Sequence, residues 1–250
     1  MLEPLATAHA GDVSVSVRVL AEDNNVTCEW YYNGQRVMPT ASLIKLPIMI
    51  EAYRQVAAGA VSLDDMLTLK AEDQVPGSGI LTDHFSPGMS LSLRDAIRLM
   101  IRYSDNTATN LVVDHIGLPS TSKTMAELGF PETQLHSKVF RRDSSIAPQR
   151  SEIYGLGSTT AEDMTDLLVR IERGELVESL QRTLNARIAA GLGVDGDFGS
   201  ATEAAGACLI AVRKLAQGAG ETIVVVLGST SSSARYVDAR NLFAWSWRKR

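Results

Sequence analysis

Strand-like patterns stand at both ends of this 250-residue chain, with helix-like patterns between them. From Val13 to Val19, valine alternates with serine or arginine, the period-two pattern of a half-buried strand. Asp23-Asn24-Asn25 is typical of a hairpin turn before a second strand. Further strands are expected at 207–212 and 222–227, and a helix at about 233–247. The two ends of the chain are therefore predicted to build one sheet.

The middle of the chain has the apolar spacing of helices. Five segments carry it: 42–58, 93–103, 107–116, 120–128 and 160–173. We therefore predict an α/β protein of the α+β type, with an antiparallel sheet from both chain ends and an all-helical lobe. One domain is expected over 1–250. Its sheet lobe would comprise 1–41 with about 185–250, and its helical lobe about 42–184.

Composition excludes several classes of function. The net charge of −5 and the pI near 5.4 argue against nucleic acid as a partner. No apolar run reaches the length of a membrane span. The four histidines are scattered and no C-x-x-C occurs, so neither a metal site nor a cofactor is predicted. A monomer is expected.

The segment Ser42-Leu43-Ile44-Lys45 places a serine and a lysine three residues apart before an apolar run. On a helix, such residues share a face. A serine hydroxyl becomes a useful nucleophile when a nearby base takes its proton. A lysine can be that base only where burial or neighbouring cations hold part of it neutral. Ser-x-x-Lys also occurs by chance in most chains of this length.

A second polar motif, Ser104-Asp105-Asn106, lies between two predicted helices. Its simplest interpretation is an N-cap for the second helix. The 62 residues from Ser42 to Ser104 also leave room for helices to fold back and bring the motifs together.

With both motifs in this order, the chain resembles the penicillin-recognising serine enzymes, especially the class A β-lactamases, over about 13–184. The resemblance implies that Ser42 is the nucleophile and Lys45 its proton acceptor or relay. Ser104 would pass a proton toward the leaving nitrogen, and Asn106 would bind substrate and hold Lys45. Asp105 would be structural. The substrate would be a β-lactam or a cell-wall peptide, and the single domain would be catalytic.

Two parts of that family's pattern are missing here. The segment 139–148 contains no E-x-x-L-N, and Asp143 and Glu152 are interpreted as solvated loop charges. Without that glutamate, acylation can proceed while deacylation stays slow. K-T-G is also absent after Asn106. The region from Val194 onward instead resembles D-alanyl-D-alanine carboxypeptidases. That resemblance offers the hydroxyls of Ser200 or Thr202 and the N–H of Ala201 as substrate contacts.

The segment 193–205 permits other interpretations. It resembles the core of peptidoglycan-binding repeats, and its Asp/Gly alternation suggests a calcium loop whose ligand spacing is not met. A Gly/Asp-rich connection before a strand is the simplest account. No clear strand is predicted between residues 175 and 204.

Three functions stay open at this point. The first is a serine hydrolase that forms an acyl-enzyme with β-lactams, with slow deacylation. The second is a D-alanyl-D-alanine carboxypeptidase or penicillin-binding protein. The third, of another class, is a non-catalytic cell-wall-binding relative with a decayed site.

The resemblance also implies where the protein acts and whether its two cysteines form a disulfide. Relatives act in the periplasm or outside the cell, although this chain shows no signal peptide; either a leader has been removed or the protein stays inside. In the family's strand order two strands separate Cys28 from Cys208. The distance would be about 14 Å, which exceeds disulfide reach. Two buried free thiols are expected.

Overall fold

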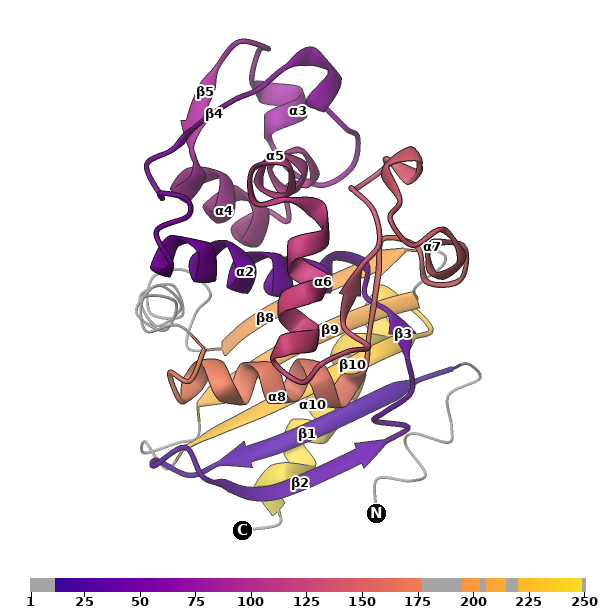
Figure 1. Cartoon of the computed structure of the whole chain (residues 1–250). Coiled ribbons are helices and arrows are strands. Elements are labelled where there is room, and N and C mark those ends of the chain that lie inside the picture. Colours follow the sequence, from indigo (N-terminus) through magenta and orange to yellow (C-terminus); the bar gives the residue numbers. More distant parts are fainter. Residues whose placement is uncertain (1–11, 177–194, 203–205, 215–219, 249–250) are drawn as a thin grey trace. The chain divides into compact units, whose positions relative to one another are not determined.

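The structure, a computed structural model, describes residues 12–176, 195–202, 206–214 and 220–248. The chain divides into two compact units. The sheet unit draws on 1–43 and 158–250, and the helical unit comprises 44–157. Figure 1 colours the chain along its sequence, so the residues of each unit can be followed there. None of the described helices is long and apolar enough to cross a membrane.

The sheet unit contains an antiparallel sheet from both chain ends, as predicted. Its order is β2-β1-β10-β9-β8. The strands are β1 (Ser14–Leu20), β2 (Val26–Tyr32), β8 (Asp195–Thr202), β9 (Gly206–Lys214) and β10 (Glu221–Ser229). The first hairpin turns at Asn24, whose φ of +60° is a conformation that asparagine tolerates. A short pair, β3 (Met38–Pro39) with β7 (Gly157–Thr159), joins Pro39 to Ser158.

Two helices cover the sheet. The helix α8 (Ala161–Glu172) packs on β1 and β10, and α10 (Ser232–Arg248) packs on β10 and β9. Adjacent residues of β10 serve different clusters: Val224 packs with Leu242 of α10, and Ile223 with Val169 of α8. Successive strand residues point to opposite faces, so both faces are covered. This corrects the half-buried β1 of the sequence prediction, because every residue of β1 is buried.

Two further sequence predictions meet different outcomes. The segment 193–205 was expected to be a connection, but residues 195–202 form β8, paired along its length with β9. Pairing with a neighbour overrides the low strand propensity of glycine and aspartate. The predicted separation of the cysteines is confirmed, because β1 and β10 lie between the strands of Cys28 and Cys208. Neither cysteine forms a disulfide, and Cys208 is buried whereas Cys28 is only partly buried.

The helical unit is built around α2 (Lys45–Ala57), which packs against α4 (Leu93–Arg102), α5 (Asn106–Ile116) and α6 (Leu118–Glu127). These helices lie within three residues of their predicted bounds. Ser92 caps α4, because its hydroxyl accepts from the Asp95 N–H. The predicted helix at 160–173 is α8, which packs on the sheet.

Short elements complete the chain. In the helical unit these are β4 (Met66–Thr68), β5 (Ser90–Ser92), β6 (Gln134–Leu135), α3 (Leu81–His84), α7 (Pro148–Tyr154), η2 (Ala71–Asp73) and η3 (Arg142–Ser144). The 3₁₀ turn η1 (Ala41–Ile44) leads directly into α2.

Candidate functional site

Lys45, the first residue of α2, has no solvent-exposed surface. Its Nζ lies 2.7 Å from the main-chain oxygen of Ser104, 3.0 Å from Ser104 Oγ and 2.9 Å from Asn106 Oδ1. A lysine ammonium has three N–H donors, and each has an acceptor here. Lys45 of the first motif therefore meets the second motif within the helical unit.

Burial sets the protonation of this amine. Loss of solvation lowers the pKa of Lys45 from 10.5 to about 7, and the nearby Asp105 carboxylate opposes that shift. At neutral pH the amine is thus divided between its protonated and neutral forms. A neutral amine can accept a proton from a hydroxyl, and the protonated form can return it.

Asp105 holds the loop that carries Ser104 and Asn106. One carboxylate oxygen accepts from the Ala108 N–H at 2.8 Å and caps α5. The other accepts from the N–H groups of Ile80 and Leu81, at 2.7 and 2.9 Å. The loop packs so closely that a Cβ added at Gly79 would lie 2.3 Å from Asp105 Cγ. The N-cap predicted from the sequence therefore exists and is part of this cluster.

Ser42 lies on η1, three residues before Lys45, and is partly exposed. The preceding residue, Ala41, has a φ of +45°. A left-handed conformation at a residue with a side chain costs about 1–2 kcal/mol. Such strain is commonly found at functional sites. Ser104 has the same feature, with a φ of +52°.

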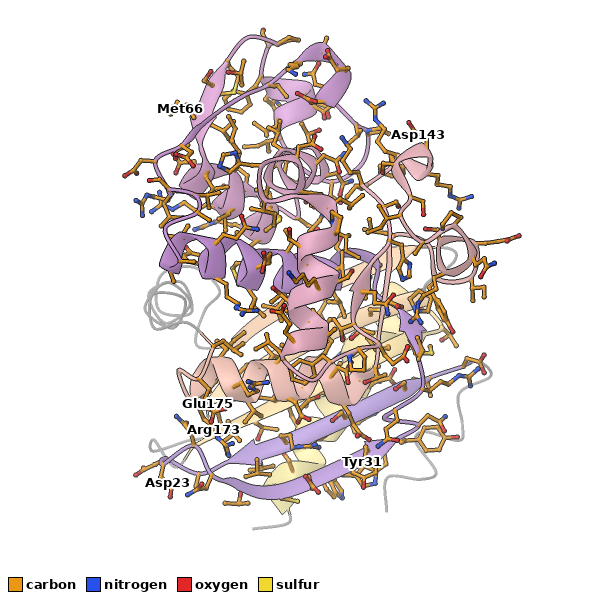
Figure 2. The ribbon with its side chains drawn as sticks, viewed as in Figure 1. Asp23, Tyr31, Met66, Asp143, Arg173 and Glu175 are labelled. Carbon is orange, nitrogen blue, oxygen red and sulfur yellow. The ribbon has the colours of Figure 1, made fainter. Side chains whose placement is uncertain are left out.

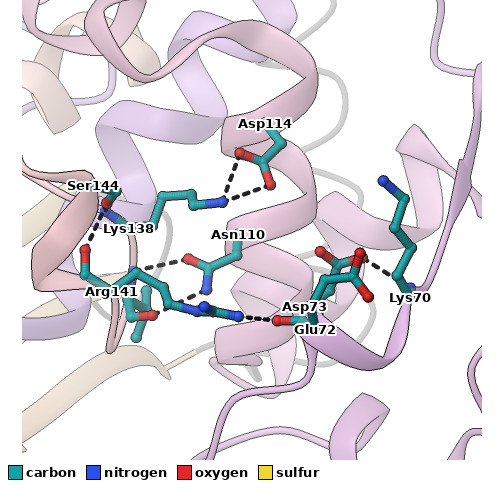
Figure 3. Close-up of polar contacts among 9 residues, drawn as sticks. Lys70, Glu72, Asp73, Asn110, Asp114, Lys138, Arg141 and Ser144 are labelled. Carbon is teal, nitrogen blue, oxygen red and sulfur yellow. Dashed lines mark hydrogen bonds and ion pairs between the residues drawn. The ribbon is translucent and has the colours of Figure 1, made fainter.

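A second loop, residues 137–147, is fastened to α5 by Asn110. The Asn110 amide donates to the Val139 main-chain oxygen at 3.0 Å, and its oxygen accepts from the Val139 N–H at 2.8 Å. Figure 3 shows this pair together with the Lys138–Asp114 ion pair. Asn110 follows Asn106 by four residues, so both lie on one face of α5. The loop residue that Asn110 holds, Val139, and the next residue, Phe140, are both apolar.

Two carboxylates near this loop are exposed. The side chain of Asp143, on η3, points away from the ribbon (Figure 2), and Glu152 lies on the exposed side of α7. Within the described part of the chain, no three His, Cys, Asp or Glu side chains gather as metal ligands would.

Ser200, Ala201 and Thr202 lie on β8 in the sheet unit, where their backbones pair with Cys208, Ala207 and Gly206. The side chains of these three residues fall outside the described part of the structure. The structure thus brings together Lys45, Ser104, Asp105 and Asn106. Of the other predicted residues, Ser42 lies on η1 and Ser200, Ala201 and Thr202 lie on β8.

Sequence reasoning missed Asn110, Gly77 and Phe140. Asn110 could have been found from its spacing, because it stands one helical turn after Asn106 on the same predicted helix. Gly77 belongs to the Gly77-Ser78-Gly79 turn, whose glycines both have positive φ. For Phe140 the only signal is an isolated aromatic residue within a polar loop.

The chain is similar to known proteins in sequence and in fold. The profile of the beta-lactamase enzyme family matches residues 1–189. A beta-lactamase of Proteus vulgaris is 26% identical over 183 residues, which are 72% of this chain and 57% of that protein. The chain spans between 46% and 63% of the length of the first curated relatives that it matches.

Solved structures show the same fold. A beta-lactamase from Sphaerobacter thermophilus superposes with a TM-score of 0.73 at 28% identity, over 90% of this chain and 86% of that one. A leucine-to-glutamate mutant of PBP-A, in its acyl-enzyme complex with penicillin-G, superposes with a TM-score of 0.78 at 20% identity, over 98% and 94%. The predicted fold, with strands from both chain ends and a helical region, is confirmed.

Proposed function

Because this chain belongs to the beta-lactamase enzyme family, we propose that it is a serine acyl-transfer enzyme for β-lactams. Ser42 is its nucleophile, and release of the acyl group is slow. The proposal rests above all on one observation, the fully buried Lys45 amine bonded to Ser104 and Asn106.

Acylation is an addition in which every atom of the lactam is kept. Ser42 Oγ attacks the lactam carbonyl carbon while the neutral Lys45 amine takes the hydroxyl proton. The carbon–nitrogen bond of the ring then breaks. The proton passes from Lys45 through the Ser104 hydroxyl to the leaving nitrogen, which stays attached to the acyl group through the rest of the opened molecule. This route uses the 3.0 Å contact between Lys45 Nζ and Ser104 Oγ.

Deacylation requires a water molecule and a base that activates it. The resemblance assigns that base to a loop glutamate, but the loop segment fastened to α5 carries Val139 and Phe140. The carboxylates of Asp143 and Glu152 are exposed. A long-lived acyl-enzyme follows, which favours a penicillin-binding activity over efficient lactam hydrolysis. Substrate contacts from Ser200, Ala201 and Thr202 are part of this proposal by resemblance alone.

Two alternatives use the same cluster. A D-alanyl-D-alanine carboxypeptidase would attack a peptide carbonyl with the same nucleophile. A non-catalytic cell-wall-binding relative would keep the fold without acylation, and the missing K-T-G favours this second alternative. The family's β-lactam substrates and secreted or periplasmic location come to this chain as part of the proposal.

Intact mass spectrometry separates these functions. The protein is incubated with benzylpenicillin, and its mass is followed over time beside Ser42→Ala. Acylation predicts a lasting gain of one whole benzylpenicillin, which Ser42→Ala does not show. Ser86→Ala, which alters an exposed serine of the helical unit, is the matched control and should acylate normally.

The other outcomes identify the alternatives. Loss of benzylpenicillin from solution without a lasting adduct would mean rapid deacylation. Absence of both adduct and consumption would exclude β-lactam acylation, and release of D-alanine from a D-alanyl-D-alanine peptide would then distinguish the carboxypeptidase from a binding protein.

A further inference from the structure

Phe140 has an unusual backbone conformation that also occurs at two residues in or next to the proposed site. Among the described residues, five other than glycine have a positive φ, and two of these are asparagines, which tolerate it. The remaining three are Ala41, next to Ser42, then Ser104, and Phe140 with a φ of +56°. An outlier of this kind is a reason to ask what the residue does.

The neighbours of Phe140 hold this conformation from both sides. Val139 is bonded through its N–H and its oxygen to the Asn110 side chain. Arg141 donates through its guanidinium to the Glu72 main-chain oxygen, and its own oxygen accepts from the Ser144 hydroxyl at 2.6 Å (Figure 3). Phe140 is therefore fixed by contacts that its own side chain does not make.

The Phe140 ring is exposed although it is apolar. Its exposed fraction of 64% exceeds that of any other aromatic residue in the described ranges; the next is Tyr31 at 53%. Exposure of a large ring forgoes stabilisation that burial would give. A loop that holds a ring both strained and exposed is a candidate contact surface for a ligand.

Gly77 shows what the ring faces. A Cβ built on Gly77 would lie 2.8 Å from Asn106 Nδ2 and 3.3 Å from Phe140 Cε2. The amide and the ring thus border the same point in space. One N–H of the Asn106 amide donates to the Pro76 oxygen at 3.1 Å. The amide has a second N–H, and no bond from it is found within the described residues.

Building on the proposed acylation, we infer that Phe140 is a specificity residue that packs against the apolar acyl side chain of a β-lactam bound at Asn106. The amide binds a polar group of the substrate, and the ring beside it covers the aromatic or aliphatic group attached there. Contact between two aromatic groups adds stabilisation beyond that of the apolar area that it buries. β-Lactams without such a side chain gain nothing from Phe140.

Two substrates and one pair of variants test this inference. Benzylpenicillin carries an aromatic acyl side chain, and 6-aminopenicillanic acid is the same bicyclic lactam without it. Second-order acylation rate constants are measured by intact mass for the whole protein and for Phe140→Asn. Asparagine tolerates a positive φ, so this variant removes the ring while the loop conformation is kept.

Phe140→Asn should acylate roughly 5- to 20-fold more slowly with benzylpenicillin. With 6-aminopenicillanic acid its rate should stay within about twofold of the wild type. Phe140→Tyr keeps a ring and should retain the preference. Phe85→Asn removes another exposed aromatic residue of the helical unit and should change neither rate.

Equal slowing with both substrates, or no slowing with either, would overturn the role of Phe140 while leaving acylation itself established. Failure of the wild type to acylate with either lactam would instead overturn the proposed function and this inference with it. Thermal unfolding gives an independent reading. Phe140→Asn should unfold at the same temperature as the wild type or higher, because it relieves the left-handed strain. A large fall in that temperature would mean that the ring serves folding.

Discussion

Lys45 Nζ is bonded to Ser104 at two atoms, the main-chain oxygen at 2.7 Å and the hydroxyl oxygen at 3.0 Å. The main-chain oxygen can only accept, whereas the hydroxyl can also donate. When Lys45 is protonated it donates to both. When it is neutral, its lone pair can accept from the Ser104 hydroxyl. The pair can therefore pass a proton in either direction without moving the backbone.

Acylation should depend on pH through Lys45. The base must be neutral, and burial lowers the pKa of Lys45 to about 7. The second-order rate constant with benzylpenicillin should rise about tenfold per pH unit below 7 and become level above it. Rates measured between pH 5 and 9 check this. A rate that is independent of pH over that range would exclude Lys45 as the base.

Lys45 should also make stability depend on pH. Between its folded pKa of about 7 and its ordinary value of 10.5, the unfolded chain binds a proton that the folded chain does not. The free energy of unfolding should therefore rise with pH in this window, by up to about 1.4 kcal/mol per pH unit relative to Lys45→Met. The contribution is fully present above 10.5 and is lost as pH falls through 7.

Urea unfolding of both proteins at several pH values measures that difference. The exposed Lys123 provides the control. Wild type and Lys123→Met should show parallel pH dependence, while wild type and Lys45→Met diverge. Parallel curves for Lys45→Met as well would mean that the amine keeps an ordinary pKa in the folded protein.

Loss of the Asp105 carboxylate should destabilise the protein. It leaves the N–H groups of Ile80, Leu81 and Ala108 without their acceptor. We expect Asp105→Ala to lower the free energy of unfolding by about 2–4 kcal/mol. Asp143→Ala, at an exposed position, should stay within about 0.5 kcal/mol. Similar unfolding midpoints in urea for the two variants would contradict this assignment.

Asp105→Asn tests the charge separately from the cap. The Asp105 carboxylate raises the pKa of Lys45, so the neutral side chain should lower that pKa further. The midpoint of the acylation pH profile should move to lower pH. A midpoint that stays in place would show that Asp105 acts on the loop alone.

A carboxylate at residue 139 should speed release of the acyl group. Val139 is bonded to Asn110, which lies one helical turn after Asn106, so Val139→Glu would place a carboxylate on the loop segment that Asn110 holds. The lifetime of the benzylpenicillin adduct should fall about tenfold or more. Ile146→Glu, at an exposed position of the same loop, should not shorten it. Equal lifetimes in all three proteins would exclude this segment as the place for a deacylating base.

Local patterns in the sequence were sufficient for most of the fold. Valine alternation located β1, and helical spacing located α2, α4 and α5. The burial of both faces of β1 could not be predicted from the local sequence, because it depends on two helices from distant parts of the chain. β8 was missed because its glycines and aspartates disfavour strands, and pairing with β9 decides its structure.

The part of the site that could be predicted from the sequence consists of the residues in the two motifs. The resemblance that Ser-x-x-Lys and Ser-Asp-Asn carry implied that Asn106 would hold Lys45, and the 2.9 Å contact is present. The conformation of Phe140 was beyond sequence reasoning, since a positive φ at phenylalanine follows from contacts made by its neighbours. The side chains of Ser200 and Thr202 lie outside the described structure, so their role stays a prediction.

The most direct test of the central claim is the intact mass of the wild type and Ser42→Ala after incubation with benzylpenicillin. Our account predicts that the wild type gains the mass of one complete benzylpenicillin and keeps it over hours, while Ser42→Ala gains nothing. An unmodified wild type, or an equal gain in the variant, would contradict it.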